Sequence, residues 1–301
     1  MAQNSRTNET KPHTTTGRNS GLTRRSYVRS LAAVATATTA IGAAGTAAAQ
    51  SGEPEVIEAA GETQTLEGGD VLENVIIDFS NGNYHTITVT GDATIRNVGF
   101  KGTHEHDQNP IVVTGDGEVL IENVYLGDGC VRPSSVSSHG QVGIFAHREF
   151  SGELTIRRCN IQNWPNNGVY ASAPDKGGQG TVHIENCYGK NNYVSCFRIG
   201  SSGSTITDSI ALNDGEGRYT GRPVWLWGSD VTVDGGQFQS GSYGGAIHIK
   251  GSTQATVKNT VHDGYSGSPA TEENVDASGA GIDTSIPDDI PRSPEEAAGG
   301  N

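Results

Sequence analysis

A short unit of apolar and polar residues recurs eight times along the chain and predicts its architecture. Neighbouring units lie 22 to 35 residues apart. Repetition at this period is typical of a solenoid, in which one supersecondary unit stacks on the next. The apolar positions on which the units align are Leu72, Ile95, Ile121, Ile156, Ile184, Ile206, Val233 and Val257.

Two residues after each of these apolar positions the sequence favours a turn. Asn tolerates the left-handed backbone conformation and hydrogen-bonds within its own turn, and five of the eight positions are Asn. If the units stack at the strand spacing of about 4.8 Å, these side chains can bond to one another along the solenoid. The predicted column contains Asn74, Asn97, Asn123, Asn186 and Asn259, with Arg158, Asp208 and Gly235 at the other three positions.

Each repeat divides into three short strands. In residues 93–116, the runs ATIR, VGFKG and IVV are separated by Asn97, by a polar loop and by a Gly-rich turn. No helical periodicity interrupts such runs, which indicates β structure throughout. We therefore predict an all-β parallel solenoid of about eight coils over residues 66–265.

This repeat pattern resembles the right-handed parallel β-helix of the pectate-lyase superfamily, whose coils hold three strands and often an Asn ladder. The resemblance covers residues 66–262 and rests on the repeat, not on a catalytic motif. The RxPxxR segment of pectate lyases is absent, and so are the paired aspartates of polygalacturonases. The resemblance implies a polysaccharide cleft beside the third strand of each coil.

The two ends of the chain differ from the repeat. The pair Arg24-Arg25, followed by an Ala-rich stretch, is typical of a twin-arginine signal peptide over residues 1–49. We therefore expect a secreted protein. No permanent membrane anchor is expected, because the stretch is rich in Ala and Thr and interrupted by Gly. Residues 50–65 are assigned to a linker or cap, and the acidic residues 266–301, rich in Pro, Gly and Ser, to a disordered tail.

Charge narrows the range of partners. Residues 1–49 hold six of the 20 Lys and Arg and one of the 34 Asp and Glu, so the rest carries 14 basic and 33 acidic residues, a net charge of −19. Strong acidity with scarce Lys resembles the proteins of extreme halophiles, and a haloarchaeal origin is expected. Nucleic acid is not expected as a partner, because no basic stripe neutralises phosphates.

The four cysteines suggest packing rather than metal binding. None has a CxxC partner, so a zinc site is not indicated. Cys159 and Cys187 occupy equivalent inward positions on successive coils, about one strand spacing apart. Reduced thiols in the core are preferred over a disulfide for this pair, and the states of Cys130 and Cys196 stay open.

Strand alternation predicts which third-strand residues face outward. If Val142, Ile144 and Ala146 face the bore, Phe145 and His147 face outward. The same alternation places a side chain of each following coil on the outside. For the segment 224–227 we expect the Val and Leu inward, because two indoles would overfill a narrow bore. The resulting row contains Phe145, Tyr170, Arg198, Trp225, Trp227 and His248.

Aromatic rings beside an Arg suit a sugar chain, since rings pack on pyranose faces and Arg binds carboxylates with two hydrogen bonds. Surface aromatics that merely cover neighbouring coils are the alternative. We predict a groove for an acidic polysaccharide along the third strands. Its predicted binding residues are Phe145, Arg148, Tyr170, Tyr219, Arg222, Trp225, Trp227 and Tyr243.

Candidate chemistry in this groove is β-elimination. That reaction needs a base, a cation that neutralises the uronate carboxylate, and a proton donor. Arg198, His147 and His248 are the candidate catalytic residues. The alternative for each His is an ordinary surface residue.

A metal site is suggested by the first long loop. His104 and His106 alternate and could face one ion, together with Asp107 and with Asp128 from the next coil. Oxygen ligands alone would suit calcium, whereas the His pair would suit a transition metal. The sequence establishes no cofactor, and solvated loop residues are the alternative.

Three classes of function remain open. The chain is a secreted lyase acting on an acidic glycan, a non-catalytic glycan-binding or cell-surface protein, or a purely structural solenoid. An enzyme needs titratable groups that converge within one or two coils. A binding surface needs only aromatic rings and hydrogen-bond donors along several coils.

Overall fold

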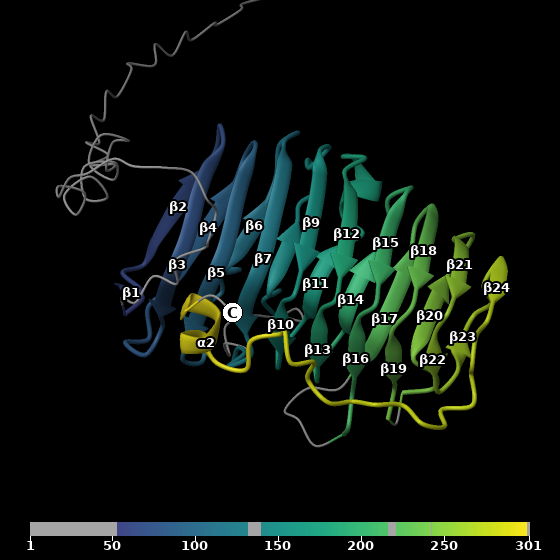
Figure 1. Cartoon of the computed structure of the whole chain (residues 1–301). Helices are drawn as coiled ribbons and strands as arrows, with labels where there is room; N and C mark the ends of the chain where they lie inside the picture. Colours follow the sequence, from purple (N-terminus) through teal and green to yellow (C-terminus); the bar gives the residue numbers. More distant parts are fainter. Residues whose placement is uncertain (1–52, 132–139, 216–220, 242, 300–301) are drawn as a thin grey trace, which may run out of the picture. The chain divides into compact units, whose positions relative to one another are not determined.

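The computed structural model describes residues 53–131, 140–215, 221–241 and 243–299. Over these residues the chain forms a parallel β-solenoid of about eight turns with almost no helix (Figure 1). The predicted all-β fold is confirmed. Two early strands at residues 55–58 and 62–66 already pair with the coil that follows them, so the solenoid begins before the predicted residue 66.

One sheet has nine strands and contains the third strand of each coil. Its strands pair in parallel in the order β2-β4-β6-β8-β11-β14-β17-β20-β23. They are β2 (Glu62–Leu66), β4 (His85–Val89), β6 (Ile111–Val113), β8 (Ile144–Ala146), β11 (Asn167–Ala171), β14 (Ser195–Ile199), β17 (Arg222–Trp227), β20 (Ile247–Lys250) and β23 (Tyr265–Ser266).

The other sheet has fifteen strands and branches at β7, which pairs with both β9 and β10. Its strand β1 (Glu55–Glu58) pairs with the part of β3 that follows the turn at Asn74. Its first strands are β3 (Asp70–Asp78), β5 (Ala93–Lys101), β7 (Glu118–Leu126), β9 (Glu153–Arg157), β12 (Thr181–Glu185), β15 (Ser204–Thr207), β18 (Asp230–Asp234), β21 (Gln254–Lys258) and β24 (Thr271–Glu273), of which β3, β5 and β7 continue through the turn into the second strand. Its second strands are β10 (Asn160–Gln162), β13 (Tyr188–Lys190), β16 (Ile210–Leu212), β19 (Gln237–Gln239) and β22 (Val261–His262).

The core consists of rows of branched side chains in register. The eight apolar positions on which the repeats align pair directly from coil to coil, and all are buried. A second row of buried side chains lines the third strands opposite them. It contains Ile87, Ile111, Ile144, Val169, Phe197, Val224 and Ile247.

The predicted column of turn residues is confirmed. All eight positions have positive φ, between 45° and 76°. Asn97 and Asn123 each donate from Nδ2 to the Oδ1 of the preceding Asn at 2.9 Å. The ladder is interrupted at Arg158, whose guanidinium turns to Glu122, and it resumes where Asn274 bonds Asn259 at 2.9 Å.

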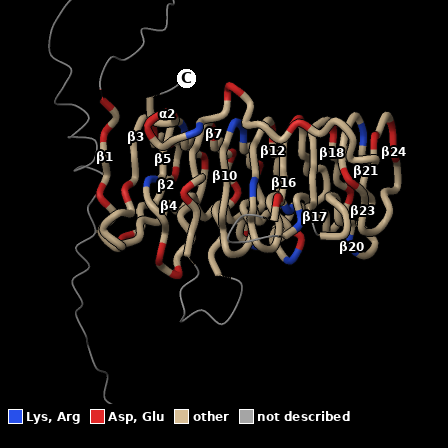
Figure 2. Tube along the Cα trace, turned by 90° about the horizontal axis from the view of Figure 1, so that it is seen from below, with Lys and Arg blue, Asp and Glu red and all other residues tan. Residues whose placement is uncertain are grey.

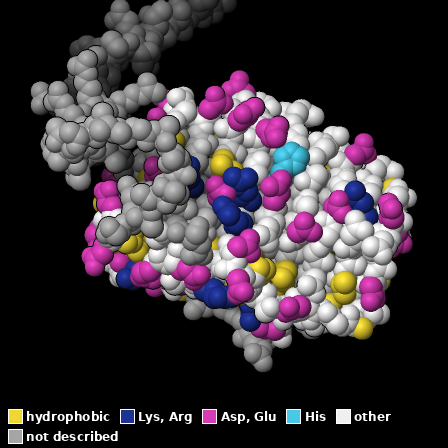
Figure 3. All heavy atoms as spheres, viewed as in Figure 1, with side chains coloured by type: hydrophobic (Ala, Val, Ile, Leu, Met, Phe, Trp, Pro, Cys, Tyr) yellow, Lys and Arg dark blue, Asp and Glu magenta, His cyan; other side chains and the backbone are white. Residues whose placement is uncertain are grey.

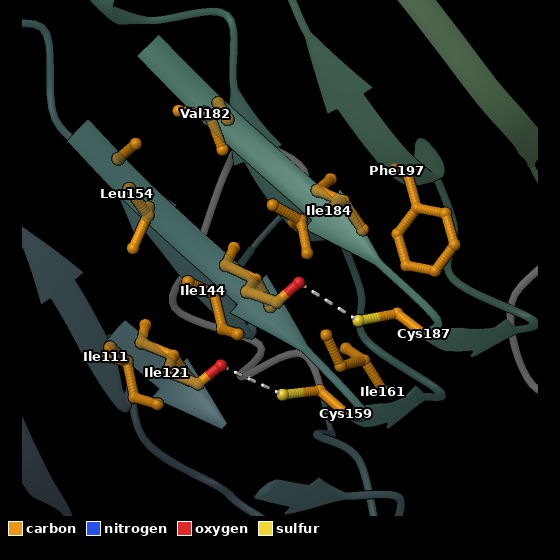
Figure 4. Close-up of a cluster of buried hydrophobic side chains, with 14 of the residues drawn as sticks. Ile111, Ile121, Ile144, Leu154, Cys159, Ile161, Val182, Ile184, Cys187 and Phe197 are labelled. Atoms are coloured by element: carbon orange, nitrogen blue, oxygen red, sulfur yellow. Dashed lines mark hydrogen bonds between the residues drawn. The ribbon is translucent and has the colours of Figure 1, made fainter. Parts of the chain in front are cut away.

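Small inward side chains fill the position after this turn. Cys159 and Cys187 lie there on successive coils, and their thiols point into the core toward the backbone oxygens of Ile121 and Ile156 (Figure 4). All four cysteines are buried thiols, so the preference for a reduced pair is confirmed. Burial and the neighbouring Cys187 raise the pKa of the Cys159 thiol.

Opposite charges alternate along the outer surface of the first strands. Glu73, Arg96, Glu122, Arg157 and Glu185 are in register, and close ion pairs join Arg96 to Glu73 and Arg157 to Glu122. Figure 3 shows Lys and Arg side chains mixed with Asp and Glu on the visible face. This surface has a hollow of about 430 Å³ with mixed apolar, polar and charged lining and one of about 330 Å³ lined largely by charged groups.

The predicted disordered tail is wrong. After β24, the chain runs back along the second strands and ends in α2 (Pro294–Gly299), which packs on β3, β5 and β7 (Figure 1). We call residues 277–299 the strap. Its Ile290 is fully buried against Tyr188, Ile210 and Leu212. Composition indicates disorder, but it does not reveal the apolar surface that the solenoid offers to the strap.

Side chains of the solenoid also bond the strap backbone. Asn123 and Asn160 donate from Nδ2 to the carbonyl oxygens of Ala297 (3.1 Å) and Pro291 (2.7 Å). α2 sits closest over Gly99, where an added Cβ would come within 2.2 Å of the Pro294 oxygen. Glycine is therefore required at this position for the strap to dock.

Substitution of Gly99 should loosen the strap. Gly99→Ala forces α2 away from β5, and we expect a loss of about 1–3 kcal/mol in the free energy of unfolding, the usual range for an overpacked site. Urea unfolding measures the loss, and limited trypsin digestion should cut faster after Arg292. The control is Gly91→Ala, whose added Cβ would meet its nearest atom at 3.6 Å. Equal stability of the two variants would contradict this docking contact.

Candidate functional site

The predicted outward row lies on the nine-stranded sheet. Phe145, Tyr170, Arg198, Trp225 and His248 are paired residue to residue across β8, β11, β14, β17 and β20. The prediction that they share one line on successive coils is confirmed. Strand register thus places three aromatic rings, a guanidinium and an imidazole along the solenoid axis.

The orientation predicted for the Trp-containing strand is also confirmed. Val224 and Leu226 are fully buried in the bore. Trp225 and Trp227 face outward and are half-buried. Their rings are nearly parallel, with centroids 5.5 Å apart.

Arg198 is packed among the rings rather than exposed. Its residue is 6% exposed, and its Cζ lies 4.3, 4.2 and 4.7 Å from the ring centroids of Tyr170, Trp225 and Trp227. Burial lowers the pKa of the guanidinium, and the charge of Arg222 adds to that effect. Removal of the Arg198 side chain would therefore leave a gap between three rings.

No described residue accepts a hydrogen bond from Arg198. Its Nε is enclosed without a hydrogen-bond partner. A ligand group at this point would find a cation with available donors.

A second guanidinium lies on the same cluster. The Arg222 Cζ is 4.2 Å from the centroid of Trp225 and 4.8 Å from that of Tyr243. Its Nε donates to Nδ1 of His248 at 3.3 Å, and its Nη1 donates to the Val194 carbonyl at 3.2 Å. Burial and then the Arg222 charge lower the pKa of His248, which favours the neutral imidazole that this bond requires.

Two lysines complete the cluster at Trp227. Their Nζ atoms lie 4.6 Å (Lys176) and 5.7 Å (Lys250) from its ring centroid. Lys250 follows the predicted alternation, whereas Lys176 lies in a short 3₁₀ helix, η1 (Pro174–Lys176), and was missed. The unusual length of the turn after β11 is the signal that could have identified it.

The cations of this cluster differ from most other described Lys and Arg side chains, which form ion pairs. Among the described Lys and Arg side chains, seven form ion pairs with carboxylates: Arg96, Lys101, Arg157, Arg158, Lys190, Lys258 and Arg292. The other described cations have no described carboxylate within ion-pair distance, and they are Arg148, Lys176, Arg198, Arg222 and Lys250. Figure 2 shows Lys and Arg positions beside β17 and β20 on a trace where Asp and Glu are more frequent. Within the described ranges, positive charge at the aromatic cluster therefore has no carboxylate partner.

The predicted catalytic residues do not converge. His147 follows β8, contacts Phe145 and lies 3.8 Å from a Glu149 carboxylate oxygen. His248 is on β20, four strands further along the sheet, or about 19 Å at the spacing of a sheet. Arg198 lies midway between them. Among the described residues of the row, His248 is hydrogen-bonded to another titratable side chain, that of Arg222.

Two further predicted binding residues are not part of the described cluster. Arg148 is exposed beside His147 and does not contact the rings of the cluster. Tyr219 lies outside the described residues. Tyr243 is 36% exposed and packs on His248, with ring centroids 5.5 Å apart.

The predicted metal ligands are not brought together. His104 is fully buried, packs edge-on against Phe79 and has its Nδ1 3.8 Å from the Cys130 sulfur, whereas His106 is half-buried against Tyr84. Within the described ranges, no group of three or more His, Cys, Asp or Glu side chains could hold a metal ion. The two imidazoles therefore do not face one ion.

Asp128 is held by the solenoid instead. One of its carboxylate oxygens accepts the Tyr125 hydroxyl at 2.8 Å, and the other accepts the Gly102 backbone N–H at 2.7 Å. Asp107 is exposed in the loop and accepts a bond from Gln108. The predicted four-residue site is wrong, because its members serve the core and a turn.

No protein family, no curated protein and no solved structure matches the chain. None of the helices in the described part of the chain is long and apolar enough to cross a membrane.

Buried His104 should make stability depend on pH. Burial lowers its pKa from 6.5 to about 4, so the unfolded chain binds the extra proton between these values. Stability is therefore full above about pH 6.5 and falls by about 3 kcal/mol as the pH drops toward 4. Urea unfolding from pH 7.5 to 4 should show this loss, and His104→Leu should flatten the profile. The outward His183→Gln is the control, and an unchanged slope in His104→Leu would contradict the assignment.

Proposed function

We propose that the outward face of β8, β11, β14, β17 and β20 binds an acidic glycan without acting on it. The observation that supports this proposal is the cluster of uncompensated cations on aromatic rings. Arg and Trp are enriched where binding energy concentrates, because they combine apolar area with directional donors. A carboxylate or sulfate group would supply the counter-charge that no described residue supplies.

The rest of the chain supports a selective ligand rather than any polyanion. Outside residues 1–49 the net charge is −19, so a long polyanion such as nucleic acid is repelled away from the cluster. An oligosaccharide that covers only the coils of the row avoids that repulsion. We also propose that the protein is exported by the twin-arginine route and is halophilic, as Arg24-Arg25 and the scarcity of Lys suggest.

Replacement of Arg198 tests the binding proposal. Arg198→Met keeps most of the packing but removes the charge, and a lost charge-assisted contact of about 1.5–3 kcal/mol weakens binding of oligouronates roughly ten- to a hundred-fold. Arg198→Lys should recover only part of the affinity, because an ammonium lacks the two-pronged donor geometry. Isothermal titration calorimetry with uronate oligomers measures both effects.

The matched control is Arg96→Met, which removes an ion-paired Arg from the other sheet. It should bind oligouronates like the unmodified chain, and circular dichroism should show all variants folded. A folded Arg198→Met variant with undiminished affinity would refute the role of this face. A folded protein that binds no acidic glycan at all would favour a purely structural solenoid.

A polysaccharide lyase resembling pectate lyases is the second candidate. The observation that favours it is His248, whose lowered pKa keeps the imidazole neutral beside a guanidinium that could neutralise a uronate carboxylate. Its Nδ1 accepts from Arg222 and its Nε2 is enclosed, so Nδ1 would act as the base only after a substrate carboxylate draws Arg222 away. Cleavage would produce unsaturated uronates with ultraviolet absorbance, and His248→Gln should reduce their formation at least a hundred-fold, the usual contribution of a general base. A flat absorbance trace with every uronate polymer, with and without calcium, would exclude this candidate in favour of binding alone.

A further inference from the structure

The indole faces of the candidate site are already occupied by cations of the protein. In the sheet, β14 lies on one side of β17 and β20 lies on the other. Arg198 reaches Trp227 from β14, and Lys250 reaches it from β20. Cations from both neighbouring strands therefore lie close to this ring.

Trp225 is contacted in the same way. The Arg198 and Arg222 Cζ atoms each lie 4.2 Å from its centroid. Arg198 comes from β14, whereas the Arg222 Nε is bonded to His248 on β20, which places that group toward the opposite side. Both indoles are thus in contact with cations of the protein before any ligand binds.

Ring electrostatics reinforce this arrangement. The face of an indole is negative and its edge is positive, so cations settle on the faces and the edges point outward. Exposed edges then add to the positive potential of the neighbouring Lys and Arg. The surface thus attracts anionic groups, and we expect this attraction to contribute more to binding than stacking on apolar sugar faces.

The cations also follow the repeat of the solenoid. Lys176 belongs to the turn after β11, Arg198 to β14, Arg222 to β17 and Lys250 to β20. Successive coils thus contribute one unpaired cation each, at an axial interval of about 4.8 Å. This interval is close to the length of one hexose in an extended chain.

We propose that the face selects its ligand by fixed anionic groups on consecutive sugars, either carboxylates or sulfate esters, and not by the sugar rings. Trp225 and Trp227 are positioning residues that hold Lys176, Arg198, Arg222 and Lys250 in place. This inference rests on the proposed glycan binding and specifies how the glycan is recognised.

Dextran and dextran sulfate of equal length test the selection, because they share a backbone and differ only in charge. Titration of the full chain, at the lowest NaCl concentration that keeps its circular dichroism native, should give binding of dextran sulfate at least a hundred-fold tighter than that of dextran. Equal binding of the two would overturn charge selection and leave glycan binding intact. No binding of dextran sulfate or of uronate oligomers would instead refute the proposed function.

A second measurement tests the positioning role of Trp227. Trp227→Leu removes the ring that holds Lys176 and Lys250, so dextran sulfate binding should weaken about ten-fold and depend less steeply on salt. Trp227→Phe keeps a ring face for the cations, so it should retain most of the affinity for dextran sulfate and most of the salt dependence. Unfolding of each variant is followed in parallel, and the proposal is overturned if folded Trp227→Leu keeps the affinity and salt dependence of the unmodified chain.

Discussion

Parallel stacking in register is the constraint on which this structure depends. Each coil lies one strand spacing from the next, so the neighbours of a side chain are the equivalent side chains of the coil before it and the coil after it. Apolar positions tolerate this repetition well, which explains the unbroken rows of Ile and Val in the bore. The turn column tolerates it because an Asn amide is both donor and acceptor, and Asn97 bonds Asn74 while accepting from Asn123.

Charged side chains cannot repeat in this way, because like charges directly opposite one another destabilise a sheet. The fifteen-stranded sheet meets the constraint by alternating sign, as in Glu73, Arg96 and Glu122. The nine-stranded sheet meets it with rings, since Arg198 has Tyr170 before it and Trp225 after it. Two different solutions to one packing problem thus give ion-paired charges on one sheet and a local cluster of cations on the other.

The same constraint explains which features the sequence predicted. The turn column and the inward rows repeat in every coil, so each was supported by many independent positions. Arg198 and the Trp pair followed from that register by alternation alone. Register does not report side-chain burial, and the enclosure of Arg198 by three rings could not be predicted.

Features that occur once escaped prediction. The strap docks through single contacts such as that of Ile290 with Tyr188, and its composition resembles that of disordered segments. His104 lies in a loop that reads as solvated, yet it is buried beside Phe79 because the next coil covers it. Lys176 reaches the cluster from a turn that only one coil lengthens.

The two charge arrangements differ in what they leave available to a ligand. A carboxylate paired with an Arg neutralises it and occupies its donors, as Glu122 does for Arg157. An aromatic ring attracts the cation through the flat face of the guanidinium and accepts no hydrogen bond from the N–H groups at its edge. These donors therefore stay available. Burial of Arg198 among Tyr170, Trp225 and Trp227 therefore fixes the position of the charge and preserves its capacity to bind. On an acidic chain, this packing is what allows a local site of opposite sign to persist without a carboxylate partner among the described residues.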